Sequence, residues 1–77
     1  MQIVIEHLPQ DVAEEEIREA LSQWAQVGVI KLIREGSAPA AIVEVDSHAL
    51  ADSLVRHINR HFYKGRELAA WVPLWNQ

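Results

Sequence analysis

The chain has 77 residues, of which 49% are hydrophobic; it contains no cysteine, and its formal net charge is −4. These values fit one small domain and exclude disulfides, thiolate metal sites and a largely disordered chain. No apolar run approaches the roughly 20 residues that span a bilayer, and the first residues lack the basic region of a signal peptide. We therefore expect a cytoplasmic protein with no membrane partner.

The first half of the chain predicts a strand, a helix and a second strand. Residues 3–5 form a short β-type run that stops before Pro9. Asp11 and Glu14 have the spacing of a capping box, which places three consecutive glutamates in the first turn of a helix. Apolar residues then recur at helical spacing at Ile17, Ala20, Leu21 and Trp24. Residues 29–35 predict the second strand.

The second half repeats this pattern. Residues 40–45 predict a third strand, and Ser47 is a candidate N-cap for a second helix. The apolar stripe of that helix is Ala51, Leu54, Val55 and Ile58. A connector at 62–66, a fourth strand at 68–72 and a tail at 73–77 follow. The order βαββαβ predicts a single α+β domain over residues 1–77, a ferredoxin-like sandwich with both helices on one face of four antiparallel strands.

Short motifs along the chain carry a family resemblance. Trp24-x-x-Val27-Gly28 precedes the second strand, Ile58-Asn59 ends the second helix, and Gly65-Arg66 precedes the last strand. In this order and spacing they are similar to motifs of the RNA recognition motif (RRM) family. The resemblance implies binding of single-stranded RNA on the open face of the sheet. It places the family's two signature motifs on the first strand and on residues 38–45.

The positions where the family stacks bases on aromatic rings are aliphatic here, namely Val4, Ala40 and Ile42. Ala38-Pro39 also replaces the family's basic residue and glycine. Base stacking contributes about 1–3 kcal/mol per base, and the chain has only seven basic residues to neutralise phosphates. We therefore expect RNA binding to be weak.

Alternation along the strands predicts which side chains form the open face. Those expected to face the helices are Ile3, Ile5, Ile33, Ala41, Val43, Leu68 and Ala70. Those expected to face outward are Val4, Glu6, Leu32, Arg34, Ala40, Ile42, Glu44, Ala69 and Trp71. The candidate RNA-binding residues are Arg34 and Trp71 on the face, Val4, Ala40 and Ile42 as its floor, and Lys31, Lys64 and Arg66 as phosphate contacts.

The same residues allow a second hypothesis, a protein-interaction module. The aliphatic sheet face could pair with a second copy of the chain. Alternatively, a peptide could bind at the helices, because Arg60-His61-Phe62 and the acidic start of the first helix resemble features of the U2AF-homology motif. The three glutamates at 14–16 could receive a basic peptide, although an ordinary first helical turn explains them more simply.

Two aromatic positions and two histidines have competing interpretations. Trp71 could stack a base beside Arg34, but packing beneath a tail that folds over the sheet is favoured. Phe62 continues the apolar stripe from Ile58 and is expected in the core. His57 and His61 have chelating spacing but no third ligand, so no metal is expected. With no phosphate loop or nucleophile motif, we expect neither an enzyme nor a cofactor.

Overall fold

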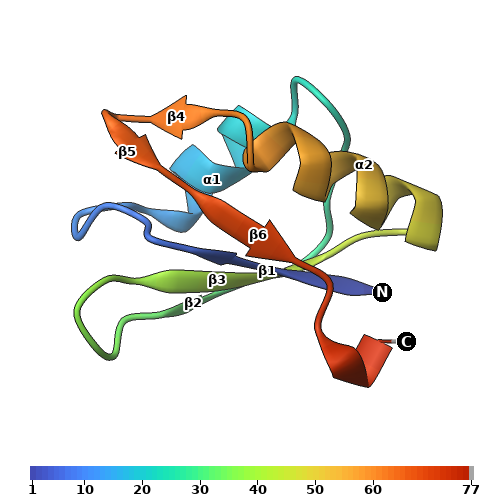
Figure 1. The fold of residues 1–77 in the computed structure, drawn as a ribbon, viewed down its shortest axis with the longest axis horizontal. Helices are drawn as coiled ribbons and strands as arrows, with labels where there is room; N and C mark the ends of the chain where they lie inside the picture. The colour runs from blue at the N-terminus through green and yellow to red at the C-terminus, as the bar shows by residue number, and fades with distance from the viewer. Residues whose placement is uncertain (77) are drawn as a thin grey trace.

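The computed structural model describes residues 1–76 and consists of a sheet layer and a helix layer (Figure 1). The sheet is antiparallel in the order β2-β3-β1-β6. Its strands are β1 (Gln2–Glu6), β2 (Ile30–Ile33), β3 (Ala40–Glu44) and β6 (Ala69–Trp71). The predicted βαββαβ sandwich, with its first and third strands at the centre, is confirmed.

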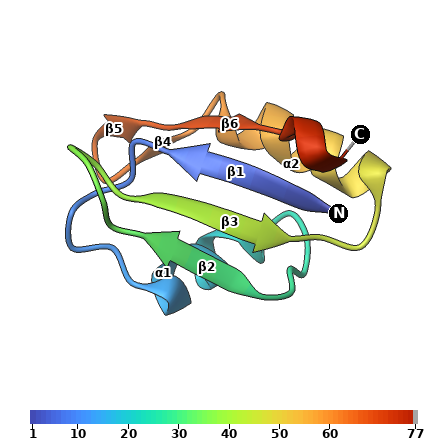
Figure 2. The ribbon, with the colours of Figure 1, turned by 90° about the horizontal axis from the view of Figure 1, so that it is seen from below.

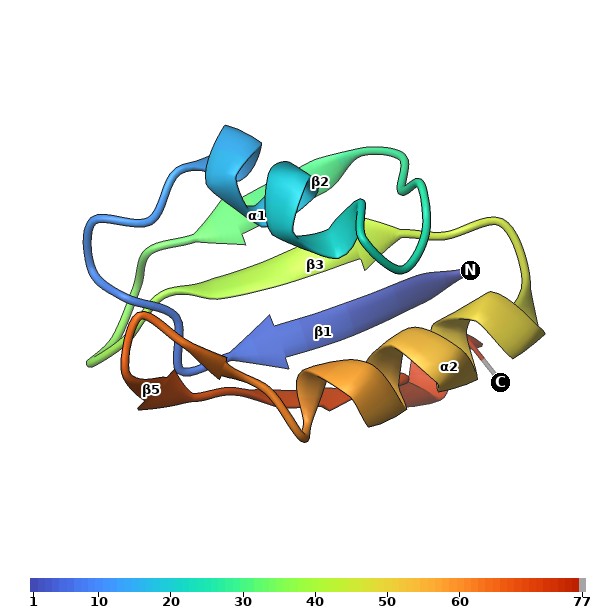
Figure 3. The same ribbon diagram turned by 90° about the horizontal axis from the view of Figure 1, so that it is seen from above.

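The helices α1 (Glu14–Leu21) and α2 (His48–Ile58) both cover one face of the sheet (Figure 3). Figure 2 shows the opposite face, which neither α1 nor α2 covers. Within the described residues, no helix has the length and apolar character needed to cross a membrane.

The core lies between the helices and the sheet because both layers bury one face. Ile3 and Ile5 of β1 and Ala41 and Val43 of β3 alternate with outward residues and are at most 2% exposed. The helices contribute the buried side chains Ile17, Leu21, Ala51, Leu54 and Ile58. Each large aliphatic side chain buried in this way contributes about 1.5–3 kcal/mol.

The N-cap of helix α1 lies two residues after Asp11, the N-cap of the predicted capping box. Its N-cap is Ala13, and the Glu16 carboxylate accepts a 2.9 Å hydrogen bond from the Ala13 N–H. The Asp11–Glu14 box is therefore wrong, although the three glutamates do occupy the first turn. Val12 precedes the cap and is fully buried in the same cluster as Ile17. This arrangement of N′ and N4 residues is that of a hydrophobic staple, which fixes the helix start.

The predicted connector at 62–66 is instead a small hairpin of β4 (Phe62–Tyr63) and β5 (Arg66–Glu67). Its turn is Lys64-Gly65, and both residues have positive φ, 51° and 80°, as a two-residue type I′ turn requires. Phe62 is 62% exposed, so its predicted core role is wrong. The α-helix ends at Ile58, and the helical spacing that placed Phe62 in the core no longer applies.

Candidate functional site

The open face of the sheet contains a row of side chains that crosses all four strands. Lys31 pairs with Ile42, Ile42 pairs with Val4, and Val4 pairs with Trp71. Paired residues of antiparallel strands share a face, so these four form the central row. The row brings together half of the residues predicted as RNA contacts.

Exposure varies along the central row with the place of each strand in the sheet. Val4, on an inner strand, is only 8% exposed, whereas Trp71, on the edge strand β6, is 40% exposed. Ala40 lies on the same face as Ile42 and pairs with Ile33. The middle of the face is therefore a closed aliphatic floor, and its accessible aromatic surface lies at one edge.

The predicted orientation of β2 is wrong by one residue. Leu32 pairs with the fully buried Ala41 and packs against the core, whereas Ile33 pairs with Ala40 on the open face. The orientation is set at Ile30, which is 3% exposed and pairs with Val43. Alternation from this buried position turns Leu32 toward the helices.

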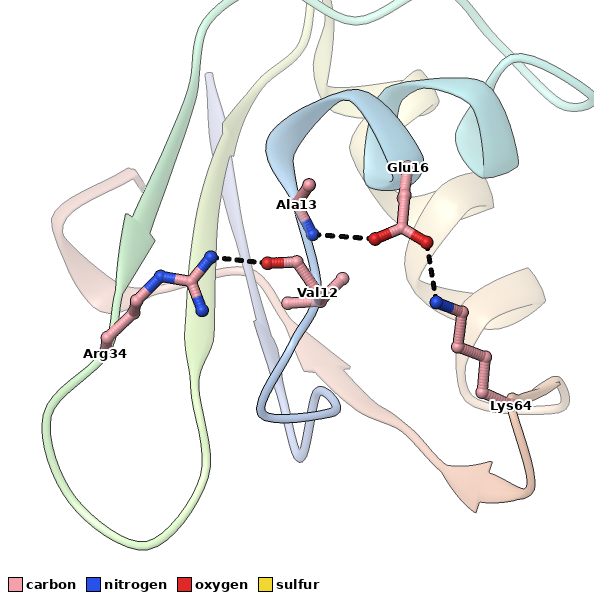
Figure 4. Close-up of polar contacts among 5 residues, drawn as sticks. All are labelled: Val12, Ala13, Glu16, Arg34 and Lys64. Atoms are coloured by element: carbon pink, nitrogen blue, oxygen red, sulfur yellow. Dashed lines mark hydrogen bonds and ion pairs between the residues drawn. The ribbon is translucent and has the colours of Figure 1, made fainter.

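Arg34 lies two residues after Leu32, so the corrected alternation turns it away from the open face. Its guanidinium donates a hydrogen bond to the backbone carbonyl of Gln10 at 2.9 Å. It donates another to the carbonyl of Val12, which Figure 4 shows. Both carbonyls belong to the segment that leads into α1. Arg34 therefore holds this loop, and the predicted pairing of Arg34 with Trp71 beside a base is wrong.

Lys64 and Arg66 lie at the hairpin rather than in the central row. The Lys64 ammonium lies 2.6 Å from the Glu16 carboxylate of α1 (Figure 4), and this contact lowers the pKa of Glu16 and raises that of Lys64. Arg66 donates to the His7 carbonyl at 3.0 Å. The structure thus pairs Lys64 with an acid, and Lys31 is the predicted phosphate contact that shares the row with Trp71.

The C-terminal tail adds a second tryptophan to the open face. The Trp75 indole donates a 2.7 Å hydrogen bond to the Gln2 side chain, which itself donates to Glu44 at 2.9 Å. Gln2 and Glu44 pair across β1 and β3, on the face of Val4. The short 3-10 helix Leu74–Asn76 lies on the side of the sheet away from α1 and α2 (Figure 1).

The tail does not bury Trp71 as predicted. Trp71 keeps 40% of its surface exposed, and Leu74 and Trp75 are 82% and 67% exposed. The sequence predicts only a covering role for the tail that contains Trp75, because strand alternation gives no information about a residue beyond the last strand. The one available signal was two tryptophans within five residues of each other.

The histidines considered as metal ligands lie on the opposite side of the molecule. His57 stacks on Trp24 with a centroid distance of 5.2 Å, and His61 meets the edge of the same ring at 5.3 Å. Among residues 1–76, no group of three or more His, Cys, Asp or Glu residues could hold a metal ion.

Comparisons with known proteins agree with this architecture. A family model described as RNA recognition motif matches residues 3–69, and no curated protein matches the chain in sequence. The solved structure of the Rna15 RRM with bound RNA (GU) has a TM-score of 0.82 at 22% identity, over 95% of this chain and 82% of that chain. RNA Binding Protein PG1 has a TM-score of 0.80 at 24% identity, over 96% and 94%. The RRM of S. pombe Puf1 has a TM-score of 0.80 at 17% identity, over 95% and 96%.

Proposed function

Because the chain belongs to the RNA recognition motif family, we propose that it binds single-stranded RNA weakly through the open face of its sheet. Domains of this family are generally RNA-binding and not catalytic. The observation that carries the proposal is the central row, which ends in the exposed Trp71 at one edge and in Lys31 at the other.

Bases would stack at the β6 edge instead of over the central strands. Trp71 and Trp75 offer exposed rings on one side of the face, and aromatic rings accept any base. The RNA strand would then cross the aliphatic floor of Val4, Ala40 and Ile42 toward Lys31. Three strand spacings separate Trp71 from Lys31, or about 14 Å, so the ammonium would contact a phosphate beyond the stacked bases.

The composition of the face supports a low affinity. Two stacking rings contribute about 1–3 kcal/mol each, and Lys31 adds one phosphate contact. Glu6 and Glu44 lie on the same face and repel phosphates, although the N-terminal ammonium lies 3.8 Å from Glu44. We therefore expect a Kd of about 0.1–1 mM at low salt.

An NMR titration of the isotope-labelled protein with mixed RNA oligomers tests the proposal. Amide signals of Val4, Lys31 and Ile42 and the indole signals of Trp71 and Trp75 should shift. Trp71→Ala and Trp75→Ala should each weaken binding by about 5-fold to 160-fold. Phe62→Ala removes an exposed ring at the hairpin and is the matched control, with unchanged binding. Absence of shifts on the face at millimolar RNA would refute the proposal.

A second candidate function is self-association through the same face. The exposed Leu74 and Trp75 beside the apolar row favour it, because exposed apolar patches mark interfaces. Sedimentation over a range of concentrations tests it. A monomer at millimolar concentration would exclude self-association, while Trp71→Ala should weaken any dimer that forms.

A further inference from the structure

On the helix side of the molecule, a groove separates the C-terminal ends of α1 and α2. It has a volume of about 410 Å³ and is lined by Gln23, Trp24, Arg56, His57, Arg60 and His61. Two of these residues are cationic, two are histidines, and none is a carboxylate. This composition contrasts with the net charge of −4 of the whole chain.

The two arginines of the groove are not used by the fold. Arg18, Arg34 and Arg66 each donate to a backbone carbonyl, and Lys64 pairs with Glu16. Arg56 and Arg60, in contrast, are exposed, and within the described residues their guanidinium groups make no hydrogen bond or ion pair. Their charges are therefore available to a ligand.

We infer that this groove is a docking site for an acidic segment of a partner protein, separate from the proposed RNA face. Arg56 lies in the last turn of α2, and Arg60 lies just beyond the end of that helix, so both residues line the same groove. A segment with several closely spaced carboxylates could therefore bind both guanidinium groups. Guanidinium groups bind carboxylates through paired hydrogen bonds.

The aromatic residue in the groove argues against RNA as the occupant. His57 stacks on the ring of Trp24, and His61 contacts the edge of that ring. The Nδ1 of His57 also lies 2.8 Å from the Ser53 carbonyl, which fixes that ring. Trp24 is therefore engaged within the protein, and the groove recognises its ligand by charge and not by stacking.

An NMR titration with a peptide of alternating glutamate and serine tests the inference, with alternating glutamine and serine as the uncharged control. The glutamate peptide should shift the amides of residues 56–61 and the Trp24 indole at low salt. Binding should weaken as salt is raised. Arg56→Glu with Arg60→Glu should reduce the affinity about tenfold.

Lys31→Glu is a control for position because it reverses one exposed charge on the opposite face. It should leave the peptide affinity within about twofold of wild type while weakening RNA binding. The double arginine variant should weaken peptide binding and leave RNA binding unchanged. Each of the following results would overturn the inference: no shift in the groove, equal binding of the glutamine peptide, equal weakening by Lys31→Glu, or displacement of the peptide by RNA oligomers. The first two outcomes leave the proposed RNA binding at the sheet face untouched.

Discussion

The side-chain amide of Asn59 binds both backbone groups of Ala70. Its Nδ2 donates to the Ala70 carbonyl at 3.0 Å, and its Oδ1 accepts from the Ala70 N–H at 2.8 Å. Asn59 is the C-cap of α2, and Ala70 lies in β6, at the edge of the sheet. An edge strand presents unpaired backbone groups, so Asn59 satisfies them and joins α2 to the strand that carries Trp71.

We predict that Asn59→Ala lowers the free energy of unfolding by about 1–3 kcal/mol. The change removes two hydrogen bonds worth about 0.5–1.5 kcal/mol each and leaves the backbone groups of Ala70 without a partner. Urea unfolding followed by tryptophan fluorescence measures the loss. Asn59→Asp keeps the acceptor without the donor and should lose an intermediate amount. Gln26→Ala, at an exposed position, is the control, and equal stability of the Gln26 and Asn59 variants would contradict the prediction.

Lys31 and Arg34 should show opposite effects, although both are cations at β2. Arg34→Ala should lower the free energy of unfolding by about 1–2 kcal/mol, because it removes the charged donors to the loop before α1. Lys31→Ala should leave stability unchanged and lower the salt slope of RNA binding by about 1. Thermal unfolding and RNA titrations at several salt concentrations measure the two effects.

Arg34→Lys provides the control for this pair. It keeps the charge but replaces the planar fork that reaches two carbonyls, so it should be destabilised like Arg34→Ala and still bind RNA. Full stability of Arg34→Lys would show that charge, and not the fork, holds the loop. If Arg34→Ala lowered the RNA affinity as much as Lys31→Ala does, Arg34 would have to contact RNA, and the prediction would be wrong.

The fold could be predicted because its apolar residues follow strand and helix periods that agree with each other. Ile17 and Leu21 mark one helix, and alternation in β3 separates Val43 from Ile42. The orientation of β2 could not be predicted in this way, since Leu32 and Ile33 are adjacent and both apolar. It depends on the pairing of Ile30 with Val43, which is a tertiary contact.

The candidate site was predicted only in part for a similar reason. Val4, Ile42 and Trp71 lie in regular strands, where alternation places them correctly on the open face. Trp75 contacts Gln2, and Lys64 contacts Glu16, across 73 and 48 positions of the chain. No local pattern reports such pairs, so the tail aromatic was missed and Lys64 was assigned to phosphate binding.

Gly65 should tolerate substitution poorly even though its surroundings are open. A Cβ at this position would meet no atom within 4 Å, but the backbone has a φ of +80°. Left-handed backbone costs about 1–2 kcal/mol for an ordinary residue, so Gly65→Ala should lower the melting temperature. Gly65→Asn should lower it less, because asparagine enters this conformation more readily. Equal melting temperatures of Gly65→Ala and wild type would contradict the left-handed turn at Lys64-Gly65.

The ion pair between Glu16 and Lys64 should make stability depend on pH in the acid range. The hydrogen bond from Lys64, followed by that from the Ala13 N–H, lowers the pKa of Glu16 below its ordinary value of 4.5. A carboxyl whose pKa is lowered by folding adds stability above its unfolded pKa, and that stability is lost as the pH falls through the folded pKa. The contribution of Glu16 is therefore present at neutral pH and disappears in acid.

Glu16→Gln should consequently be less stable than wild type at neutral pH, and the difference should shrink as the pH falls below 4.5. Urea midpoints of both proteins, measured from neutral pH into the acid range, provide the comparison. Glu15→Gln is the matched control, because Glu15 lies in the same turn and is exposed. It removes the same charge from the helix start without touching Lys64. A difference between the Glu16 variant and wild type that persists unchanged in acid would show that Glu16 stabilises α1 by another route.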